Sequence, residues 1–172
     1  MRRPRRRLPG RARRAGSSIL AGLVAPRVAE PAPLPPPPAE RRRGYGSLQL
    51  RHVDAGSCNG CEVEIANALG PVYDASRYGI SLVASPRHAD GLLVTGVVTA
   101  NMAGPLGRTL EAVPAPAIVI ACGDCALNGG VVAAGFGVVG PVAAVVAPTA
   151  EIPGCPPHPD AIIAALRRYS GR

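Results

Sequence analysis

The sequence predicts an α/β domain in which helices cover both faces of a parallel β-sheet. From Gly44 onward, apolar runs of about four to seven residues alternate with segments of helical periodicity. Strands that are buried on both faces are nearly continuous apolar runs, and their alternation with helices is typical of parallel sheets. The chain has 172 residues, which suits one domain with a modest core. We place this domain at residues 44–172.

The predicted strands are short apolar runs bounded by turn-forming residues. Asp90-Gly91 and Gly96, for example, flank one β-branched run on its two sides. The predicted strands are Ser47–Val53, Ile80–Ala84, Leu92–Thr95, Ala117–Ala121 and Val142–Ala147.

Three segments are predicted to be helices. Cys61–Leu69 has apolar residues at helical spacing and stops at Gly70-Pro71. Pro105–Ala112 is the second, and Asp160–Tyr169 is a terminal helix. Arginines in the last turn of that helix face the negative end of its dipole.

Residues 1–43 differ from the rest of the chain in charge and composition. Residues 1–51 contain 13 arginines and two glutamates, whereas residues 52–172 contain six arginines and nine carboxylates. The net charge of +8 therefore comes from the arm, and the predicted domain is mildly acidic. Repelling arginines and the run Pro35-Pro36-Pro37-Pro38 favour an extended chain, so we predict a disordered arm at residues 1–43.

Three roles are open for this arm. It is a solvated tail, an electrostatic tether to anionic lipid or an acidic subunit, or a targeting peptide. Arg13-Arg14 followed by the apolar run Ile19–Ala25 is faintly similar to a twin-arginine signal. Nucleic acid is not an expected partner, because the arm has no aromatic residue on which bases could stack. No stretch approaches the ~20 apolar residues of a membrane-spanning helix.

Three short motifs rich in glycine and proline contain the cysteines, and four of the five are candidate ligands of one metal centre. Cys58 and Cys61 lie in S-C-N-G-C-E, Cys125 in C-G-D-C-A-L-N-G-G, and Cys155 in I-P-G-C-P-P. The motifs follow predicted strands, and ligands gather at the carboxyl ends of strands in such folds. Thiolates hold iron–sulfur clusters, and tight turns let backbone N–H groups point at sulfur. We predict that these four cysteines hold one [4Fe–4S] cluster.

Other uses of the cysteines are open. A structural zinc site would join Cys58 and Cys61 to the second C-x-x-C, Cys122 and Cys125. The 60 residues between these pairs exceed the roughly 12–20 residues usual in zinc ribbons, and zinc leaves Cys155 without a role. A disulfide or a thioredoxin-like redox pair at Cys58 and Cys61 is a further alternative.

Four segments together resemble a known protein family. They are S-C-N-G-C-E-V-E-I, S-P-R-H-A-D-G-L-L-V-T-G, G-D-C-A-L-N-G-G and I-P-G-C-P-P-H-P-D-A-I. Over about residues 44–169 the chain is similar to B subunits of NADH:quinone oxidoreductase (respiratory complex I). It resembles even more closely the small subunits of energy-converting [NiFe] hydrogenases and formate hydrogenlyase. The Arg- and Pro-rich arm has no counterpart in this pattern.

The resemblance implies a flavodoxin-like domain that holds the [4Fe–4S] cluster nearest the active site of a larger subunit. Complex I B subunits carry two adjacent cysteines where this chain has Cys58-x-x-Cys61, the hydrogenase spacing. That difference favours a hydrogenase-like complex over a quinone reductase. Cys125 matches the family ligand, whereas Cys122 is an additional cysteine that we expect to be a buried thiol.

We therefore expect a non-autonomous electron-transfer subunit of an oxidoreductase complex. The implied partners are a hydrogenase-like large subunit, other iron–sulfur subunits and membrane subunits. The implied location is cytoplasmic, peripheral on the inner face of the cell membrane. The alternative from another class is a zinc-stapled, non-redox adaptor that binds acidic partners or nucleic acid through the basic arm.

Four further polar residues are candidates for secondary roles. Arg87 follows a predicted strand and lies either near the cluster or on the surface. His88 beside it either changes its protonation when the cluster is reduced or is a plain loop histidine. Glu64 matches a family glutamate and is either a proton relay or a plain acid near the helix N-terminus. Glu62 is predicted to be a surface acid that the helix dipole favours.

Overall fold

The structure of the chain is a computed structural model, and it describes residues 46–172. The predicted arm at residues 1–43 lies outside the described residues. The strands are β1 Leu48–Asp54, β2 Ile80–Leu82, β3 Gly91–Thr95, β4 Val98–Thr99, β5 Ile118–Cys122, β6 Val138–Gly140 and β7 Ala150–Ile152. The helices are α2 Gly60–Leu69, α3 Ala100–Glu111, α4 Asp124–Asn128 and α5 Pro159–Ser170. Short 3-10 turns span Ala75–Tyr78, Pro86–His88, Gly130–Val132 and Val142–Ala144.

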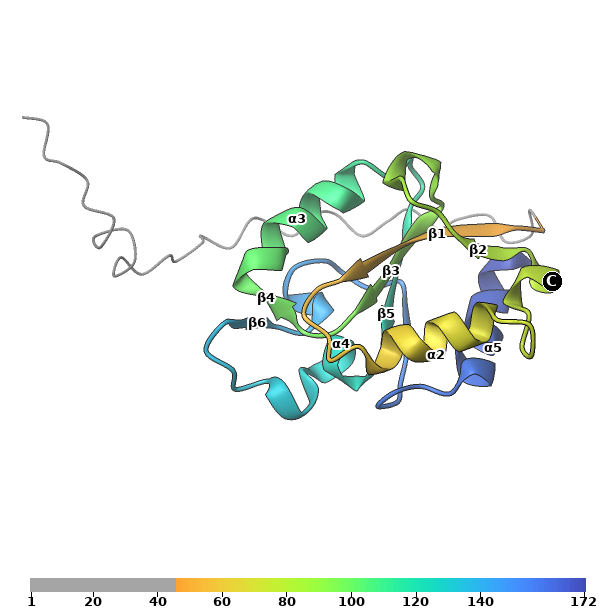
Figure 1. The fold of residues 1–172 in the computed structure, drawn as a ribbon. Helices are drawn as coiled ribbons and strands as arrows, with labels where there is room; N and C mark the ends of the chain where they lie inside the picture. Colours follow the sequence, from red (N-terminus) through yellow and green to blue (C-terminus); the bar gives the residue numbers. More distant parts are fainter. Residues whose placement is uncertain (1–45) are drawn as a thin grey trace, which may run out of the picture. The chain divides into compact units, whose positions relative to one another are not determined.

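Five strands form one parallel sheet in the order β2-β1-β3-β5-β7 (Figure 1). Numbered by themselves along the chain, these strands have the order 2-1-3-4-5, which is the flavodoxin-like order. Four of them end in one row, because Asp54 pairs with Thr95, Thr95 with Cys122, and Cys122 with Ile152. The loops that leave these strands therefore start side by side at one edge of the sheet.

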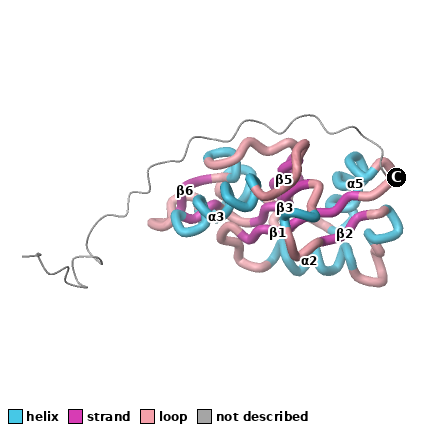
Figure 2. Tube along the Cα trace, turned by 90° about the horizontal axis from the view of Figure 1, so that it is seen from above, coloured by secondary structure: helices cyan, strands magenta, loops and turns pink. Residues whose placement is uncertain are grey.

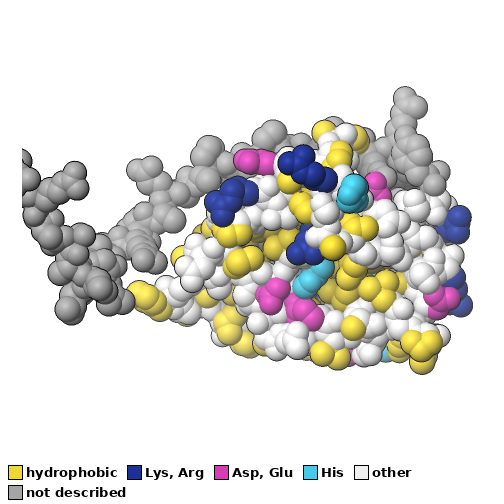
Figure 3. Space-filling model, turned by 45° about the horizontal axis from the view of Figure 1, so that its top comes forward, with side chains coloured by type: hydrophobic (Ala, Val, Ile, Leu, Met, Phe, Trp, Pro, Cys, Tyr) yellow, Lys and Arg dark blue, Asp and Glu magenta, His cyan; other side chains and the backbone are white. Residues whose placement is uncertain are grey.

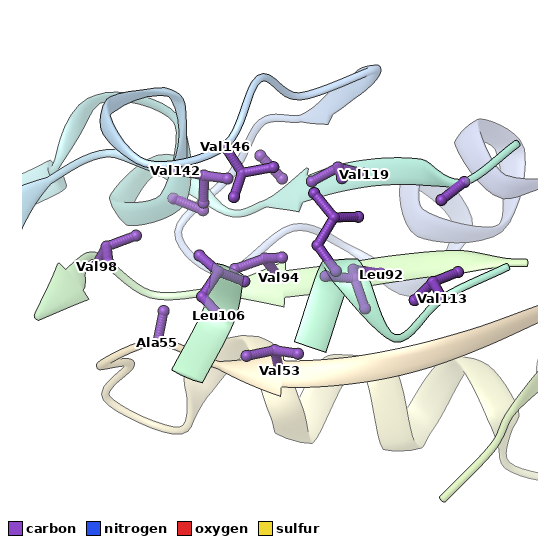
Figure 4. Close-up of a cluster of buried hydrophobic side chains, with 14 of the residues drawn as sticks. Val53, Ala55, Leu92, Val94, Val98, Leu106, Val113, Val119, Val142 and Val146 are labelled. Carbon is purple, nitrogen blue, oxygen red and sulfur yellow. The ribbon is translucent and has the colours of Figure 1, made fainter. Parts of the chain in front are cut away.

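Helices cover both faces of the sheet, as predicted. Leu106 and Leu110 of α3 pack on one face, in a cluster with Leu92, Val94 and Val119 of the central strands (Figure 4). On the other face, α2 and α5 pack against the alternate strand residues. The shared cluster on that side includes Leu48, Leu50, Ile65, Leu93, Ile118, Ile120, Ile162 and Leu166. Figure 2 shows the helices around the strands from a second direction.

Local signals fix the ends of α5. The Nδ1 atom of His158, just before the helix, accepts a hydrogen bond of 3.3 Å from the backbone N–H of Asp160. Pro159 occupies the first helical position, where its missing N–H costs nothing. Gly171 ends the helix with a φ of 77°, which an ordinary residue adopts only at a cost. The helix therefore runs close to its predicted bounds.

The predicted strand Val142–Ala147 is wrong. Val142–Ala144 is a 3-10 turn, and the strand that precedes Cys155 is β7. The segment is apolar because Val142 and Val146, both fully buried, complete the core cluster on the α3 face (Figure 4). Burial of a turn and burial of a strand leave the same short apolar run, which periodicity does not distinguish.

A second, small sheet was not predicted. It consists of β4 and β6, which pair antiparallel beside the start of α3. That helix begins at Ala100, earlier than the predicted Pro105, and contains the proline in its interior.

None of the helices within residues 46–172 has the length and apolar character needed to cross a membrane.

Basic and acidic side chains lie interspersed on the face seen in Figure 3.

The core on the α3 face generates a stability prediction. Leu106→Ala should lower the free energy of unfolding by ~2–5 kcal/mol, because Leu106 is fully buried and its truncation leaves a cavity. Urea denaturation of the full-length chain measures the change. The matched control is Val72→Ala, at a side chain that is 85% exposed, for which we expect a change within about 0.5 kcal/mol. Equal changes in both variants would contradict this packing.

Candidate metal centre

The four candidate ligands line one small pocket at the carboxyl edge of the parallel sheet. Its volume is about 40 Å³. Cys58 lies in the loop after β1, Cys61 in the first turn of α2, Cys125 in α4 after β5, and Cys155 in the loop after β7. The complete lining is Ser57, Cys58, Gly60, Cys61, Gly96, Asp124, Cys125, Gly154, Cys155 and Pro156.

The thiols differ in their exposure to solvent. Cys61 is buried and Cys125 is half-buried, whereas Cys58 and Cys155 are exposed. The site is therefore covered on the side of the sheet and open at the surface of the chain.

Two glycines leave space that the sulfurs occupy. A Cβ atom on Gly123 would lie 2.5 Å from Sγ of Cys61, and one on Gly130 would lie 2.7 Å from Sγ of Cys125. Both distances are far below van der Waals contact. Both glycines also have positive φ, 91° and 52°, which residues with a side chain rarely adopt. Any other residue at these positions would displace a thiol.

A reciprocal pair of hydrogen bonds joins the loops that carry Cys125 and Cys155. The backbone N–H of Gly154 donates to Oδ1 of Asp124 at 2.7 Å, and the N–H of Asp124 donates to the carbonyl oxygen of Gly154 at 2.8 Å. This pairing holds two of the thiol-bearing segments at a fixed spacing.

The loop that carries Cys58 is fixed by two side chains. Oδ1 of Asp54 accepts the backbone N–H groups of Gly56 at 2.9 Å and Ser57 at 2.7 Å. The N–H of Asn59 in turn donates to Oγ of Ser57 at 3.0 Å. Asn59, between the two cysteines, has a φ of 71°, a conformation that Asn tolerates better than most residues.

Glu62 is not the surface acid that the sequence predicted. Its carboxylate accepts the hydroxyl of Ser57 at 2.6 Å through Oε2 and the hydroxyl of Thr95 through Oε1. Only 18% of its side chain is exposed, because the start of α2 packs toward the end of β3. Nothing in the spacing C-E-V-E tells which of its two acids faces the sheet, so sequence reasoning had no signal for this contact.

His52 extends the same network. Its Nε2 lies 2.9 Å from Oγ1 of Thr95 and 3.5 Å from Oε1 of Glu62. Burial lowers the pKa of His52 and outweighs the opposing effect of the carboxylates of Glu62 and Asp54. The ring is therefore neutral at neutral pH, and its contact with Glu62 is not an ion pair.

The metal-free thiols hold their protons strongly. Burial, followed by the charge of Glu62, raises the pKa of Cys61 to about 11. Burial also raises the pKa of Cys125, with further contributions from Cys155 and Cys58. Neighbouring thiols contribute to these raised pKa values, because a second negative charge nearby is unfavourable. A positive metal centre among the thiols would instead lower their pKa values.

The residues fit an iron–sulfur cluster by their chemistry. Four thiols from three loops share a pocket, and glycine stands where a Cβ atom would displace two of the sulfurs. Thiolates are the usual ligands of such clusters. Within residues 46–172, no group of three or more His, Cys, Asp or Glu side chains is arranged so that it could hold a metal ion. The fit is therefore one of donor type and shared pocket.

The remaining candidates lie away from the pocket. Cys122, the last residue of β5, is fully buried as expected and does not line it. Arg87 and His88 form the turn that leads into the amino end of β3, at the opposite edge of the sheet. Glu64 is half-buried, and its Oε2 accepts a long hydrogen bond of 3.4 Å from Asn67.

Comparison with known proteins assigns the family. Residues 58–169 match the family model described as NADH ubiquinone oxidoreductase, 20 Kd subunit. The chain belongs to this family. The matched segment contains all four cysteines of the pocket.

Several relatives that resemble the chain are named as subunits of hydrogenases, formate hydrogenlyase or quinone oxidoreductases. A probable membrane-bound hydrogenase subunit (mbhJ) of Pyrococcus furiosus is 47% identical over 65% of this chain and 67% of its own length. Formate hydrogenlyase subunit 7 of Escherichia coli is 45% identical over 68% of this chain. The chloroplastic NAD(P)H-quinone oxidoreductase subunit K of Oryza sativa is 39% identical over 63%. The chain spans 46% and 48% of the length of the last two.

Solved structures agree with the family. A chain of the membrane-bound sulfane sulfur reductase, an archaeal respiratory membrane complex, has a TM-score of 0.64 and 29% identity. The match covers 73% of this chain and 70% of that one. An NAD⁺-reducing [NiFe]-hydrogenase chain, at 21% identity and a TM-score of 0.55 over 67% of this chain and 86% of that one, shows the same fold.

The unequal exposure of the cysteines generates a prediction about their reactivity in protein from which metal has been removed. Cys58 and Cys155 should be alkylated first because they are exposed, whereas Cys122 should stay unmodified even at about pH 9. Burial raises the pKa of Cys122 to about 12, so its thiolate forms only as the pH rises toward that value. Peptide mass spectrometry after timed alkylation measures each site, with unfolded protein as the control. Equal rates at Cys122 and Cys155 in folded protein would contradict the geometry.

Proposed function

We propose that this chain is the electron-transfer subunit of a membrane-associated oxidoreductase complex and holds one [4Fe–4S] cluster. Cys58, Cys61, Cys125 and Cys155 are the proposed ligands. The observation that carries the proposal is the shared pocket, because all four thiols line it in a chain of this family.

The proposed chemistry assigns distinct tasks to the chain. The cluster, when bound, supplies reversible one-electron transfer. Cys61 and Cys125 hold it from the buried side, and Cys58 and Cys155 from the exposed side. The paired hydrogen bonds of Asp124 and Gly154 keep two of these loops in place during electron transfer. The chain binds no substrate of its own in this proposal, and its residues would serve to hold the cluster and to fix its surroundings.

The spacing of the first two cysteines favours a hydrogenase or formate hydrogenlyase complex. Cys58 and Cys61 are separated by two residues, where complex I subunits carry adjacent cysteines. The relatives named as hydrogenase and formate hydrogenlyase subunits are also more similar to this chain, at 47% and 45% identity, than the quinone oxidoreductase subunit at 39%. A complex I-like role is the second candidate, supported by the family description.

The proposed partners follow from the open side of the pocket and from the relatives. A hydrogenase-like large subunit covers the exposed Cys58 and Cys155, and further iron–sulfur subunits and membrane subunits complete the complex. We place the chain on the cytoplasmic face of the cell membrane, held there by these partners. The zinc adaptor is not proposed, because it requires Cys122, which is buried outside the pocket.

Single cysteine variants test the ligand assignment. Cys125→Ala should lose or convert the cluster, because it removes a proposed thiolate, and the same holds for Cys58, Cys61 and Cys155. Cys122→Ala is the matched control and should keep about four irons and four labile sulfides per chain. Iron and sulfide analysis of the affinity-purified complex measures the outcome. Iron retained in Cys125→Ala but lost in Cys122→Ala would overturn the assignment.

A glycine variant tests the geometry without touching a ligand. Gly123→Ala should reduce the iron content, because its Cβ atom would lie 2.5 Å from Sγ of Cys61. Gly107→Ala, in α3, is the control, since a Cβ atom there meets nothing within 4 Å and alanine favours the helix. The same analysis of iron and sulfide applies. Wild-type iron in Gly123→Ala would show that this close approach does not hold the thiol.

A further inference from the structure

The polar network around Glu62 lies beside the candidate ligands and has no place in the proposed electron path. Thr95, at the end of β3, is fully buried and donates its hydroxyl proton to Glu62. The network reaches from the neutral ring of His52 to the loop of Cys58. A buried carboxylate is costly unless it is well hydrogen-bonded, so its position next to Cys61 requires an explanation.

Each oxygen of the Glu62 carboxylate accepts one hydrogen bond from a hydroxyl group. Oγ of Ser57 accepts the backbone N–H of Asn59 and donates its own proton to Oε2 of Glu62. Thr95 donates its hydroxyl proton to Oε1. This is the acceptor-only pattern of a carboxylate.

We propose that Glu62 is a positioning residue for the iron–sulfur cluster: it ties the Cys58 loop to the Cys61 helix and keeps a fixed negative charge beside the thiols. The tie runs from Asn59, between the two cysteines, through Ser57 to Glu62 on the helix. The bond to Thr95 anchors the same carboxylate to the buried end of β3. This inference rests on the proposed function.

The carboxylate of Glu62 lies close to the candidate ligands. Glu62 directly follows Cys61 in the chain, and its carboxylate bonds to Ser57, which lines the pocket. Only 18% of its side chain is exposed, so water and salt screen it less than they screen a surface acid. A negative charge beside a cluster disfavours the addition of an electron to that cluster. Glu62 therefore holds the cluster at a lower reduction potential.

The charge is tested with Glu62→Gln, which keeps the size of the side chain. In the purified complex, the ratio of reduced to oxidised cluster at a fixed solution potential should rise by roughly three- to tenfold. A redox titration followed by electron paramagnetic resonance measures this ratio without any enzyme assay. Glu64→Gln is the matched control, because it removes an acid on the same helix whose carboxylate bonds to Asn67 and not to Ser57 or Thr95. Equal shifts in both variants, or none in Glu62→Gln with its iron intact, would overturn the role of the charge.

The tie is tested with Ser57→Ala, which keeps the charge of Glu62 but removes the hydroxyl that links it to Asn59. Iron should be lost to a chelator roughly tenfold faster than from the wild type. Ser76→Ala is the control, an exposed serine whose hydroxyl donates to Asp74. Release at the wild-type rate in Ser57→Ala would overturn the tie, and this result stands even if Glu62→Gln does not assemble. Wild-type protein without iron and sulfide would instead refute the proposed function, and the inference with it.

Discussion

The candidate site depends on one constraint, which is the register of the parallel sheet. Asp54, Thr95, Cys122 and Ile152 are the last residues of four neighbouring strands, and they pair in a single row. The loops that follow these residues therefore begin next to one another. A slip of one residue in any strand would turn its buried side chains to the opposite face. The apolar pattern that builds the two cores therefore also brings the three cysteine loops together.

The sequence predicted those parts of the fold and site that local chemistry determines. The cysteine loops were predicted because each has glycine or proline beside its cysteine, and these residues mark tight turns. The central strands were predicted because they are continuous apolar runs. β7 was missed because it is a three-residue strand at the edge of the sheet with the exposed Glu151 at its centre. Val142–Ala147 was mistaken for a strand because its valines fill the core from a turn. Glu62 was misplaced because its partners, Ser57 and Thr95, come from other elements, and only the folded chain brings them together.

Glu62 shows how the fold stabilises a carboxylate that is largely shielded from solvent. A carboxylate close to several thiols opposes their ionisation, and it would be costly inside the fold without donors. Two hydroxyl groups meet that need, one from Ser57 in the Cys58 loop and one from Thr95 at the end of β3. The same bonds that satisfy the carboxylate thus fix the geometry of the loop. Asp54 serves a similar purpose with backbone N–H groups, so two acids at the ends of this loop hold it in shape.

The unequal burial of the four thiols connects this architecture to the proposed role. Cys61 is held against the sheet, whereas Cys58 and Cys155 stand at the surface. A cluster held by these residues would be shielded by the chain on one side and exposed to solvent on the other. Electron transfer requires close approach of a second centre, and the exposed side is where such a centre can come near. Under the proposed function, the open half of the pocket is thus the route for electrons, and the partner that covers it completes both the insulation of the cluster and its connection to the rest of the complex.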